Sequence, residues 1–256
     1  MSQIRIELPM RLRALLLVLM AGPALAQPVP ASGALPSPPA FSSLAPGPLP
    51  PPWRIAGLPG QKTPLTQFAV VDMLGRAVLR VATDASYGNL VFDTRKALPT
   101  AQTMLRWSWR LERGLSDSDL SSKQGDDTPI KVCVLFDMPL DGLGLGERTQ
   151  LRLARSLSGE HLPGATLCYV WDRLLPAGTL LANIYSPRVR YIVASSGAPD
   201  AGRWDRHERL LGADFMRAFG DETLSVPPIL ALVVGADADN TLGKSLAYVG
   251  DVTMAP

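Results

Sequence analysis

The 256-residue sequence contains 25 Lys and Arg and 23 Asp and Glu, and 46% of its residues are hydrophobic. When residues 1–26 are set aside as a predicted signal peptide, 22 basic and 22 acidic side chains remain, so the mature chain is formally neutral. A neutral surface argues against nucleic acid or an anionic membrane as the main partner. The remaining length is sufficient for one domain with a substantial core.

The N-terminal segment has the pattern of a secretory signal peptide. Arg11 and Arg13 precede the apolar run ALLLVLMAGPALA, which ends in the small-x-small motif ALA at residues 24–26. This pattern predicts cleavage before Gln27 and a periplasmic or secreted protein. The apolar run is short for a transmembrane helix, so we expect no membrane span in the mature protein.

A second low-complexity segment follows the predicted signal. Residues 27–52 consist mostly of Pro, Ser, Ala and Gly and contain no charged side chain. Such a segment has too little apolar surface to fold by itself, so we predict a disordered tether. The remaining residues, 53–256, are predicted to form a single domain.

From Trp53 onward, short apolar runs alternate with turn residues. Most runs are rich in Val, Leu and aromatic residues, and Gly, Pro, Asp or Asn bound many of them, as is typical of β-strands. The predicted strands cover residues 67–72, 76–83, 89–94, 103–111, 130–137, 165–172, 188–196, 227–237 and 245–254. So many strands with so few helices predict an all-β fold, a two-sheet β-sandwich.

Two short helices are expected in the connections. Residues 213–220 place Phe215 and Phe219 on one side and end in a glycine, which is typical of a helix C-terminus. Residues 147–157 carry a stripe of arginines within a long insertion at 138–164. Long insertions often form lids or binding loops, so this stripe is either an anion-binding surface or a solvated face.

The two cysteines, Cys133 and Cys168, each lie in the middle of a predicted strand. In an exported protein they form either one disulfide or two buried free thiols. Just before the first of these strands, the sequence KQGDD places Lys123 beside Asp126 and Asp127. Because adjacent strand residues face opposite ways, we expect one of the two aspartates to bind a hydroxyl-rich ligand or to pair with an arginine of the strand 103–111. The alternative is a solvated loop with a structural ion pair.

The stretch GADADNTLGKSLAYVGDV at 235–252 has the densest set of oxygen ligands in the chain. Asp237, Asp239 and Asn240 fall within four residues, and Asp251 follows. An EF-hand is excluded, because the Gly and Glu that its loop requires are missing. Two interpretations remain, a turn between the last two strands and a structural calcium site. If Asp251 lies near the other two aspartates, either a cationic side chain or Ca²⁺ must neutralise them, and Lys244 is the nearest in sequence.

Several of these segments together resemble a known family. LRWSWRL, KQGDDTPIKVCVLFD, CYVWD, RWDRHERLLGADFMRAFG and ADADNTLGKSLAYVGDV occur in this order between residues 53 and 254. This set is similar to the exported bacterial family called domain of unknown function 3047. The resemblance implies a jelly-roll sandwich akin to galactose-binding and carbohydrate-binding modules, and it implies no activity. Jelly-roll binding modules often hold a structural Ca²⁺ near the last strand, and the position of Asp251 in this sequence resembles the position of such a site.

Familiar catalytic motifs are missing from the sequence. It has no G-x-S-x-G elbow, and its two histidines, His161 and His207, form no zinc motif. The glycine-rich GLGLGE at 142–147 fits neither a dinucleotide fingerprint nor a P-loop. A glycosidase with paired carboxylates stays open, since such a pair need not be close in sequence. The acidic residues considered for that pair are Glu112, Asp126, Asp137 and Glu208.

We therefore interpret the protein as an exported, non-catalytic β-sandwich that binds a glycan or another cell-envelope component. The alternatives are a glycan-active hydrolase and a structural envelope protein. The predicted ligand-binding residues are Trp107, Trp109, Arg110, Lys123, Asp126, Asp127 and Trp171. The candidate calcium ligands are Asp237, Asp239, Asn240 and Asp251. Because most aromatic residues on strands are core, we expect at most one or two of these aromatics to be exposed.

Overall fold

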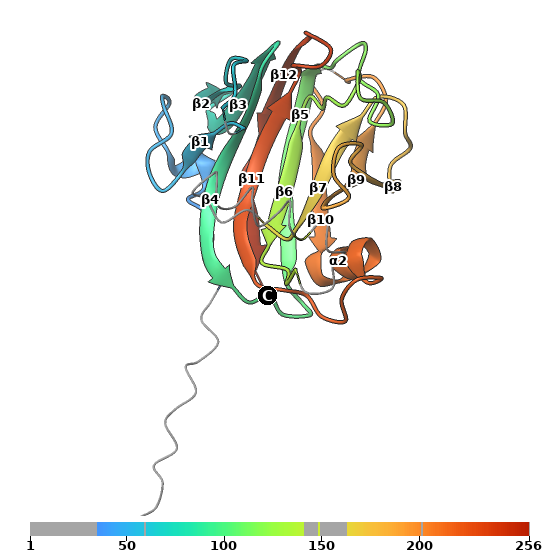
Figure 1. Cartoon of the computed structure of the whole chain (residues 1–256). Helices are drawn as coiled ribbons and strands as arrows, with labels where there is room; N and C mark the ends of the chain where they lie inside the picture. The colour runs from blue at the N-terminus through green and yellow to red at the C-terminus, as the bar shows by residue number, and fades with distance from the viewer. Residues whose placement is uncertain (1–34, 59, 141–147, 149–162, 201, 256) are drawn as a thin grey trace, which may run out of the picture. The chain divides into compact units, whose positions relative to one another are not determined.

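Two β-sheets stack on each other as a sandwich, as predicted (Figure 1). The computed structural model describes residues 35–58, 60–140, 148, 163–200 and 202–255, which all belong to one compact unit, Gly33–Pro256. The seven-stranded sheet has the order β1-β4-β11-β6-β7-β9-β8, and the six-stranded sheet has the order β10-β5-β12-β3-β2, with β13 also paired to β5. All of these pairings are antiparallel except the one between β7 and β9.

All nine predicted strands are present, and the last of them is split in two. The strands are β1 (Arg54–Ala56), β2 (Gln67–Met73), β3 (Arg76–Asp84), β4 (Tyr87–Ala97), β5 (Met104–Arg113), β6 (Lys131–Phe136), β7 (Ala165–Asp172), β8 (Leu180–Ala182), β9 (Val189–Ser196), β10 (Asp205–Leu210), β11 (Ile229–Asp237), β12 (Lys244–Val249) and β13 (Thr253–Ala255). The sequence prediction missed three strands. β1 and β8 have only three residues each, and β10 reads DRHERL, with a single apolar residue.

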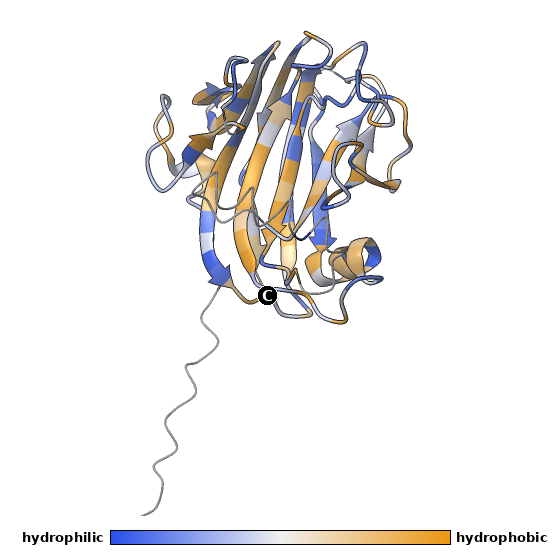
Figure 2. Ribbon diagram, viewed as in Figure 1, coloured by the Kyte–Doolittle hydropathy of each residue, from blue (hydrophilic) through white to orange (hydrophobic). Residues whose placement is uncertain are grey.

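The seven-stranded sheet is apolar on both faces, and Figure 2 colours its middle strands mainly as hydrophobic. In β7, every residue from Ala165 to Asp172 is buried. One set of alternating residues, which includes Leu167 and Tyr169, packs in the main core between the sheets. The other set, which includes Cys168 and Val170, packs in a second cluster on the outer face, where Leu120 from a loop covers it.

The segment before β1 does not follow the prediction of a disordered tether. Residues 41–43 form a 3-10 helix, and Phe41 is fully buried and stacks on Trp53 with ring centroids 5.2 Å apart. The backbone of Gly47 forms a bridge with Val70 of β2. A single large aromatic and this backbone pairing thus hold the segment on the sandwich, and the tether prediction is corrected for residues 35–52. Residues 1–34, with the predicted signal peptide, lie outside the described residues.

One of the two predicted helices is described, as α2 (Leu211–Phe219). Phe215 packs on Phe136 with ring centroids 4.5 Å apart, and Asp214 accepts hydrogen bonds from Tyr169 and Arg209. Apart from Arg148, the predicted helix at 147–157 lies outside the described residues. In the part of the chain that the structure describes, no helix is long and apolar enough to cross a membrane.

The tryptophans predicted to bind ligand are core residues. Trp107, Trp109 and Trp171 are 3%, 0% and 4% exposed and belong to the cluster between the sheets. The indole N–H of Trp109 donates to Ser195 Oγ over 2.9 Å, and that of Trp171 donates to the carbonyl of Gly197 over 3.0 Å. These side chains therefore offer no surface on which a sugar ring can stack.

His207 of the edge strand β10 is half-buried and packs against this core. Its ring centroid lies 4.8 Å from those of both Trp107 and Trp109, and its Nε2 lies 3.2 Å from Ser195 Oγ. Burial lowers the pKa of His207 from 6.5 to about 4; Asp205 opposes this shift, and Arg209 adds to it. Protonation at mild acid therefore places an unfavourable charge between the two sheets.

We predict that His207 makes the fold sensitive to acid. Because its folded pKa is lowered, the unfolded chain binds more protons between pH 6.5 and 4, and stability is lost as the pH falls through this window. The variant His207→Gln should be less stable than the wild type at pH 7.5, and this difference should shrink at pH 4.5. Urea unfolding at both pH values measures it, and a difference independent of pH would contradict the prediction.

Candidate ligand-binding pocket

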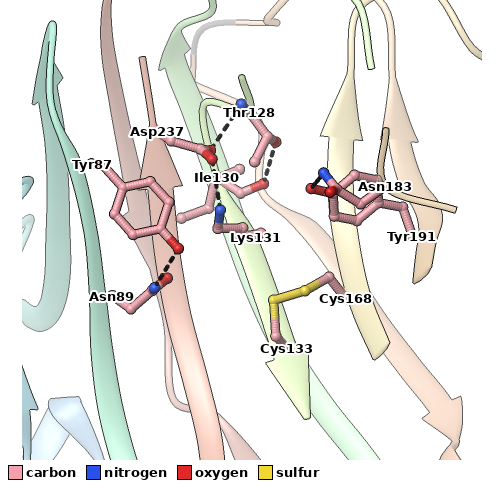
Figure 3. Close-up of a disulfide and its surroundings, with 10 residues drawn as sticks. All are labelled: Tyr87, Asn89, Thr128, Ile130, Lys131, Cys133, Cys168, Asn183, Tyr191 and Asp237. Atoms are coloured by element: carbon pink, nitrogen blue, oxygen red, sulfur yellow. Dashed lines mark hydrogen bonds and ion pairs between the residues drawn. A yellow bond between two sulfur atoms is a disulfide. The ribbon is translucent and has the colours of Figure 1, made fainter. Parts of the chain in front are cut away.

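A pocket of about 1050 Å³ lies on the outer face of the seven-stranded sheet, the face turned away from the six-stranded sheet. Strand register places its residues in rows across the sheet. The central row contains Val91, Val233, Cys133, Cys168 and Tyr191, each directly opposite the next. We call this cavity the outer-face pocket, and Figure 3 shows part of its lining.

The floor of the outer-face pocket is apolar and contains a disulfide. Cys133 and Cys168 stand opposite each other on the antiparallel strands β6 and β7, with Cα atoms 4.0 Å apart, and their sulfur atoms are bonded. Val91 and Val233 continue the floor toward β4. Of the two alternatives left open for the cysteines, the structure has the disulfide, which links the two strands at the centre of the floor (Figure 3).

A buried ion pair lies at one end of the floor. Lys131 Nζ of β6 is 2.9 Å from Asp237 Oδ2 of β11, and Asp237 Oδ1 accepts a hydrogen bond from the backbone N–H of Thr128. Both ionic side chains are less than 10% exposed. Burial lowers the pKa of Lys131, but the charge and hydrogen bond of Asp237, together with Tyr87 and Tyr191, outweigh burial and hold that pKa above its usual value. The ammonium therefore stays charged.

Gly235 allows polar side chains to lie over β11 beside this ion pair. A Cβ at this position would be 2.3 Å from Asn89 Oδ1 and 3.0 Å from Lys131 Cε. The amide of Asn89 donates to the Tyr87 hydroxyl over 3.1 Å, and the Tyr87 ring centroid lies 5.2 Å from Lys131 Nζ. A side chain at 235 would displace this polar set from the pocket.

A second polar group joins the loop before β6 to β9. The Asn183 amide donates to Asp126 Oδ2 over 2.6 Å and to the Tyr191 hydroxyl over 2.8 Å. Asp126 Oδ1 is buried and has no hydrogen-bond partner among the described residues. Burial raises the pKa of Asp126 to about 6; the Asn183 hydrogen bond opposes the shift, and the charge of Asp237 adds to it.

The loop that carries Asp126, residues 119–128, is held by the turn between β11 and β12. Asp127 accepts hydrogen bonds from the backbone N–H and the hydroxyl of Thr241 over 2.7 and 2.6 Å. The side chain of Asn240 donates to the Asp126 carbonyl over 3.0 Å. We call residues 119–128 the acidic loop. Of its three predicted binding residues, Asp126 and Asp127 are buried and Lys123 is exposed, so the two carboxylates are not part of a solvated loop.

The arginines of β5 lie elsewhere. Arg106 pairs with Glu208, and Arg110 pairs with Glu112, all of them on the six-stranded sheet. The predicted binding residue Arg110 therefore does not line the outer-face pocket, and among the described residues neither arginine pairs with the acidic loop.

Lys123 of the acidic loop contacts Tyr185. The Tyr185 hydroxyl donates to the Lys123 carbonyl over 2.9 Å, and the Lys123 ammonium lies 5.6 Å from the Tyr185 ring centroid. Tyr185 lines the pocket and is 58% exposed. Its ring is thus the aromatic surface that the buried tryptophans do not supply.

The predicted calcium ligands do not converge. Asp251 follows β12 at the end opposite the turn, where it accepts hydrogen bonds from the backbone N–H and hydroxyl of Ser42 over 2.9 and 2.7 Å. Lys131, and not Lys244, neutralises Asp237. Within residues 35–255, excluding the undescribed positions, no group of three or more His, Cys, Asp or Glu is placed to hold a metal ion.

Most of the residues that shape this pocket lie outside the set predicted from the sequence. Asp126, a predicted ligand-binding residue, lines the pocket, as do the predicted calcium ligands Asp237, Asp239 and Asn240. The lining residues outside the predicted set include Tyr87, Asn89, Lys131, Asn183, Tyr185 and Tyr191. Tyr87 and Asn89 of β4 carry a signal, because they alternate with Leu90 and Phe92 of the core. Lys131 and Tyr191 carry none, since β6 and β9 show no such alternation. Asn183 and Tyr185 carry no signal in the sequence, because they follow β8, a strand of only three residues.

A family profile described as a protein of unknown function, DUF3047, matches residues 51–253. The chain belongs to the DUF3047 family. No curated protein matches this DUF3047 chain significantly. Among solved structures, it is similar to TmCBM61 in complex with beta-1,4-galactotriose, with 12% identity, 80% of this chain and 88% of the other covered, and a TM-score of 0.33. It is also similar to the cellulose induced protein Cip1, with 11% identity, 79% and 90% coverage, and a TM-score of 0.33.

We predict strong coupling within the buried ion pair. Lys131→Met or Asp237→Asn leaves a buried charge without its partner, which should lower the free energy of unfolding by about 3–5 kcal/mol. The double variant should cost much less than the sum, because no unpaired charge remains. Urea unfolding at pH 7 measures all three. The exposed pair Lys244–Asp84 is the matched control, and its variants should change stability by about 1 kcal/mol or less.

Additive costs in the Lys131 and Asp237 variants would contradict this coupling.

We predict that the disulfide is formed in the native protein and stabilises it. Cys133 and Cys168 are 35 residues apart, so replacing both with Ala should lower the free energy of unfolding by about 4 kcal/mol in the chain-entropy model. Urea unfolding measures the loss, and a thiol assay after denaturation without reductant provides the control. Two reactive thiols in that assay would rule out the bond.

Proposed function

We propose that this protein is exported and binds a glycan, or another hydroxyl-rich component of the cell envelope, in the outer-face pocket without cleaving it. The single observation that carries this proposal is a pocket of about 1050 Å³ that combines an apolar floor with amide, carboxyl and tyrosine side chains. Ligand sites of this size are mostly apolar, with a few placed polar groups.

The lining suits the chemistry of a sugar. The amides of Asn89, Asn183 and Asn240 and the carboxylate of Asp126 offer donors and acceptors for hydroxyl groups. The exposed ring of Tyr185 offers a flat apolar surface at the edge of the pocket. A sugar ring has the same combination, since hydroxyl groups surround an apolar C–H face.

The disulfide supports the export part of the proposal. Disulfides persist in oxidising compartments such as the periplasm and are rare in the cytosol. The bond between Cys133 and Cys168 is therefore consistent with an exported protein, as is the signal-like pattern of residues 1–26.

A glycan-active hydrolase is the second candidate, and one observation favours it. The pKa of Asp126 is raised to about 6, mainly by burial, which is the range of a general acid in glycosidases. Of the acidic residues considered for a catalytic pair, Glu112 and Glu208 pair with arginines on the other sheet, and Asp137 pairs with Lys96. Only Asp126 of that set lines the pocket, where Asp93 and Asp239 are the other lining carboxylates outside the ion pair of Asp237.

We predict that Tyr185→Ala weakens glycan binding at least tenfold, because it removes the exposed ring at the edge of the pocket. Binding is screened on a glycan array and then measured by calorimetry. The matched control is Tyr248→Ala, which removes a half-buried tyrosine from the six-stranded sheet and should leave affinity unchanged. Equal losses in both variants, or no glycan bound, would refute the binding proposal.

The same ligands test the hydrolase. Release of new reducing ends that is lost in Asp126→Asn would establish cleavage and replace the non-catalytic proposal.

A further inference from the structure

We propose that the ligand carries a primary ammonium group, as in a glycan with de-N-acetylated amino sugars, and that the carboxylate of Asp126 binds it. This inference rests on the proposed glycan binding in the outer-face pocket and names the class of sugar. It is carried by two independent observations, a buried carboxylate oxygen without a partner and an excess of negative charge around it.

The first observation is the state of the Asp126 carboxylate. Asp126 is only 7% exposed, yet it lines the pocket. Its Oδ2 is held by Asn183, whereas its Oδ1 has no hydrogen-bond partner among the described residues. A buried acceptor without a donor costs about 1–3 kcal/mol, and more when it is charged. A donor on the ligand removes this penalty, so the free oxygen marks where the ligand binds.

The second observation is the charge that surrounds this oxygen. Asp127 comes from the acidic loop, Asp237 from β11 and Asp239 from the following turn, and each interacts electrostatically with another carboxylate of the set. Lys131 of β6 is the cation that acts on Asp126, and its ammonium is already bound to Asp237. The other cations that line the pocket, Arg54, Arg95 and Lys96, come from β1 and β4, and Lys96 pairs with Asp137. The excess of negative charge is therefore local to the end of the pocket that holds Asp126, where Asn183 and the Tyr191 hydroxyl are neutral.

The pKa values of the carboxylates agree with this excess. Burial and, after it, the charge of Asp237 raise the pKa of Asp239. Burial also raises the pKa of Asp126 to about 6; the Asn183 hydrogen bond opposes this shift, and the charge of Asp237 adds to it. A ligand cation would reverse the electrostatic part of both shifts. Above pH 6, Asp126 is mostly ionised and is ready to accept a charged donor.

These two observations distinguish between the functional groups that a sugar could present to Asp126. A hydroxyl group or an acetamide N–H supplies a donor to Asp126 Oδ1 but leaves the negative charge in place. A carboxylate or phosphate increases it. An ammonium supplies the donor and the opposite charge together, and charge-assisted hydrogen bonds are roughly twice as strong as neutral ones.

The test compares sugars that differ only at the nitrogen. The full chain, purified from the periplasm, is applied at pH 6.5 to a glycan array that carries matched N-acetylated and de-N-acetylated pairs. We expect the de-N-acetylated member of the preferred pair to bind at least tenfold more tightly, and calorimetry with that pair gives the ratio. Asp126→Asn keeps the shape of the side chain and removes its charge, so it should abolish this preference.

The control variant Asp200→Asn removes an exposed aspartate on the surface and should keep the full preference. Thermal melting of both variants establishes that they are folded. Equal or tighter binding of the N-acetylated member would overturn the ammonium proposal and leave glycan binding intact. A preference that survives in Asp126→Asn would also overturn it. No binding on the array would overturn both proposals together.

Discussion

The buried ion pair between Lys131 and Asp237 fixes the polar end of the pocket. It joins β6 to β11, and the second oxygen of Asp237 binds the backbone of Thr128, where the acidic loop ends. Asp127 of the same loop then holds Thr241 in the turn that follows β11. Hydrogen bonds thus connect this ion pair to the acidic loop and, through Asp127, to the turn after β11. Because each partner is buried, loss of either would leave an uncompensated charge, and the whole end of the pocket depends on both.

The rest of the pocket follows from a sheet that is apolar on both faces. Antiparallel sheets commonly expose one polar face, but here the outer row of Val91, Val233 and the disulfide is buried. Such a face needs a cover, and Leu120 of the acidic loop and Leu181 of β8 pack on it near β7 and β9. The pocket is the part of this face beside that cover. Its apolar floor and its polar end therefore have the same origin, since the covering loop also carries Asp126.

The sequence predicted the strands because these depend on local patterns, and it placed both cysteines in strands without deciding between a disulfide and free thiols. It failed for the tryptophans because period-2 alternation shows which residues share a face, but not which face is covered. In β5, the face with Trp107 and Trp109 packs against the other sheet. It failed for the calcium ligands because Asp251 and Asp237 are separated by β12, and six residues of strand span about 20 Å. Asn183 reaches Asp126 across 57 residues, a contact that tertiary structure alone creates.

His207 and Asp126 affect stability in opposite directions as the pH changes, and only Asp126 lines the pocket. His207, with its lowered pKa, favours the fold above pH 6.5, whereas Asp126, with its pKa raised to about 6, favours the fold below pH 4 and destabilises it as the pH rises through 6. The lowered pKa of the histidine is explained by its packing against Trp107 and Trp109. The aspartate has no such explanation, because one of its oxygens is buried without a partner. Asp126 lines the pocket and destabilises the fold at neutral pH, because no group among the described residues donates to its Oδ1. This is the state that we expect of a carboxylate whose hydrogen-bond donor is supplied by the ligand.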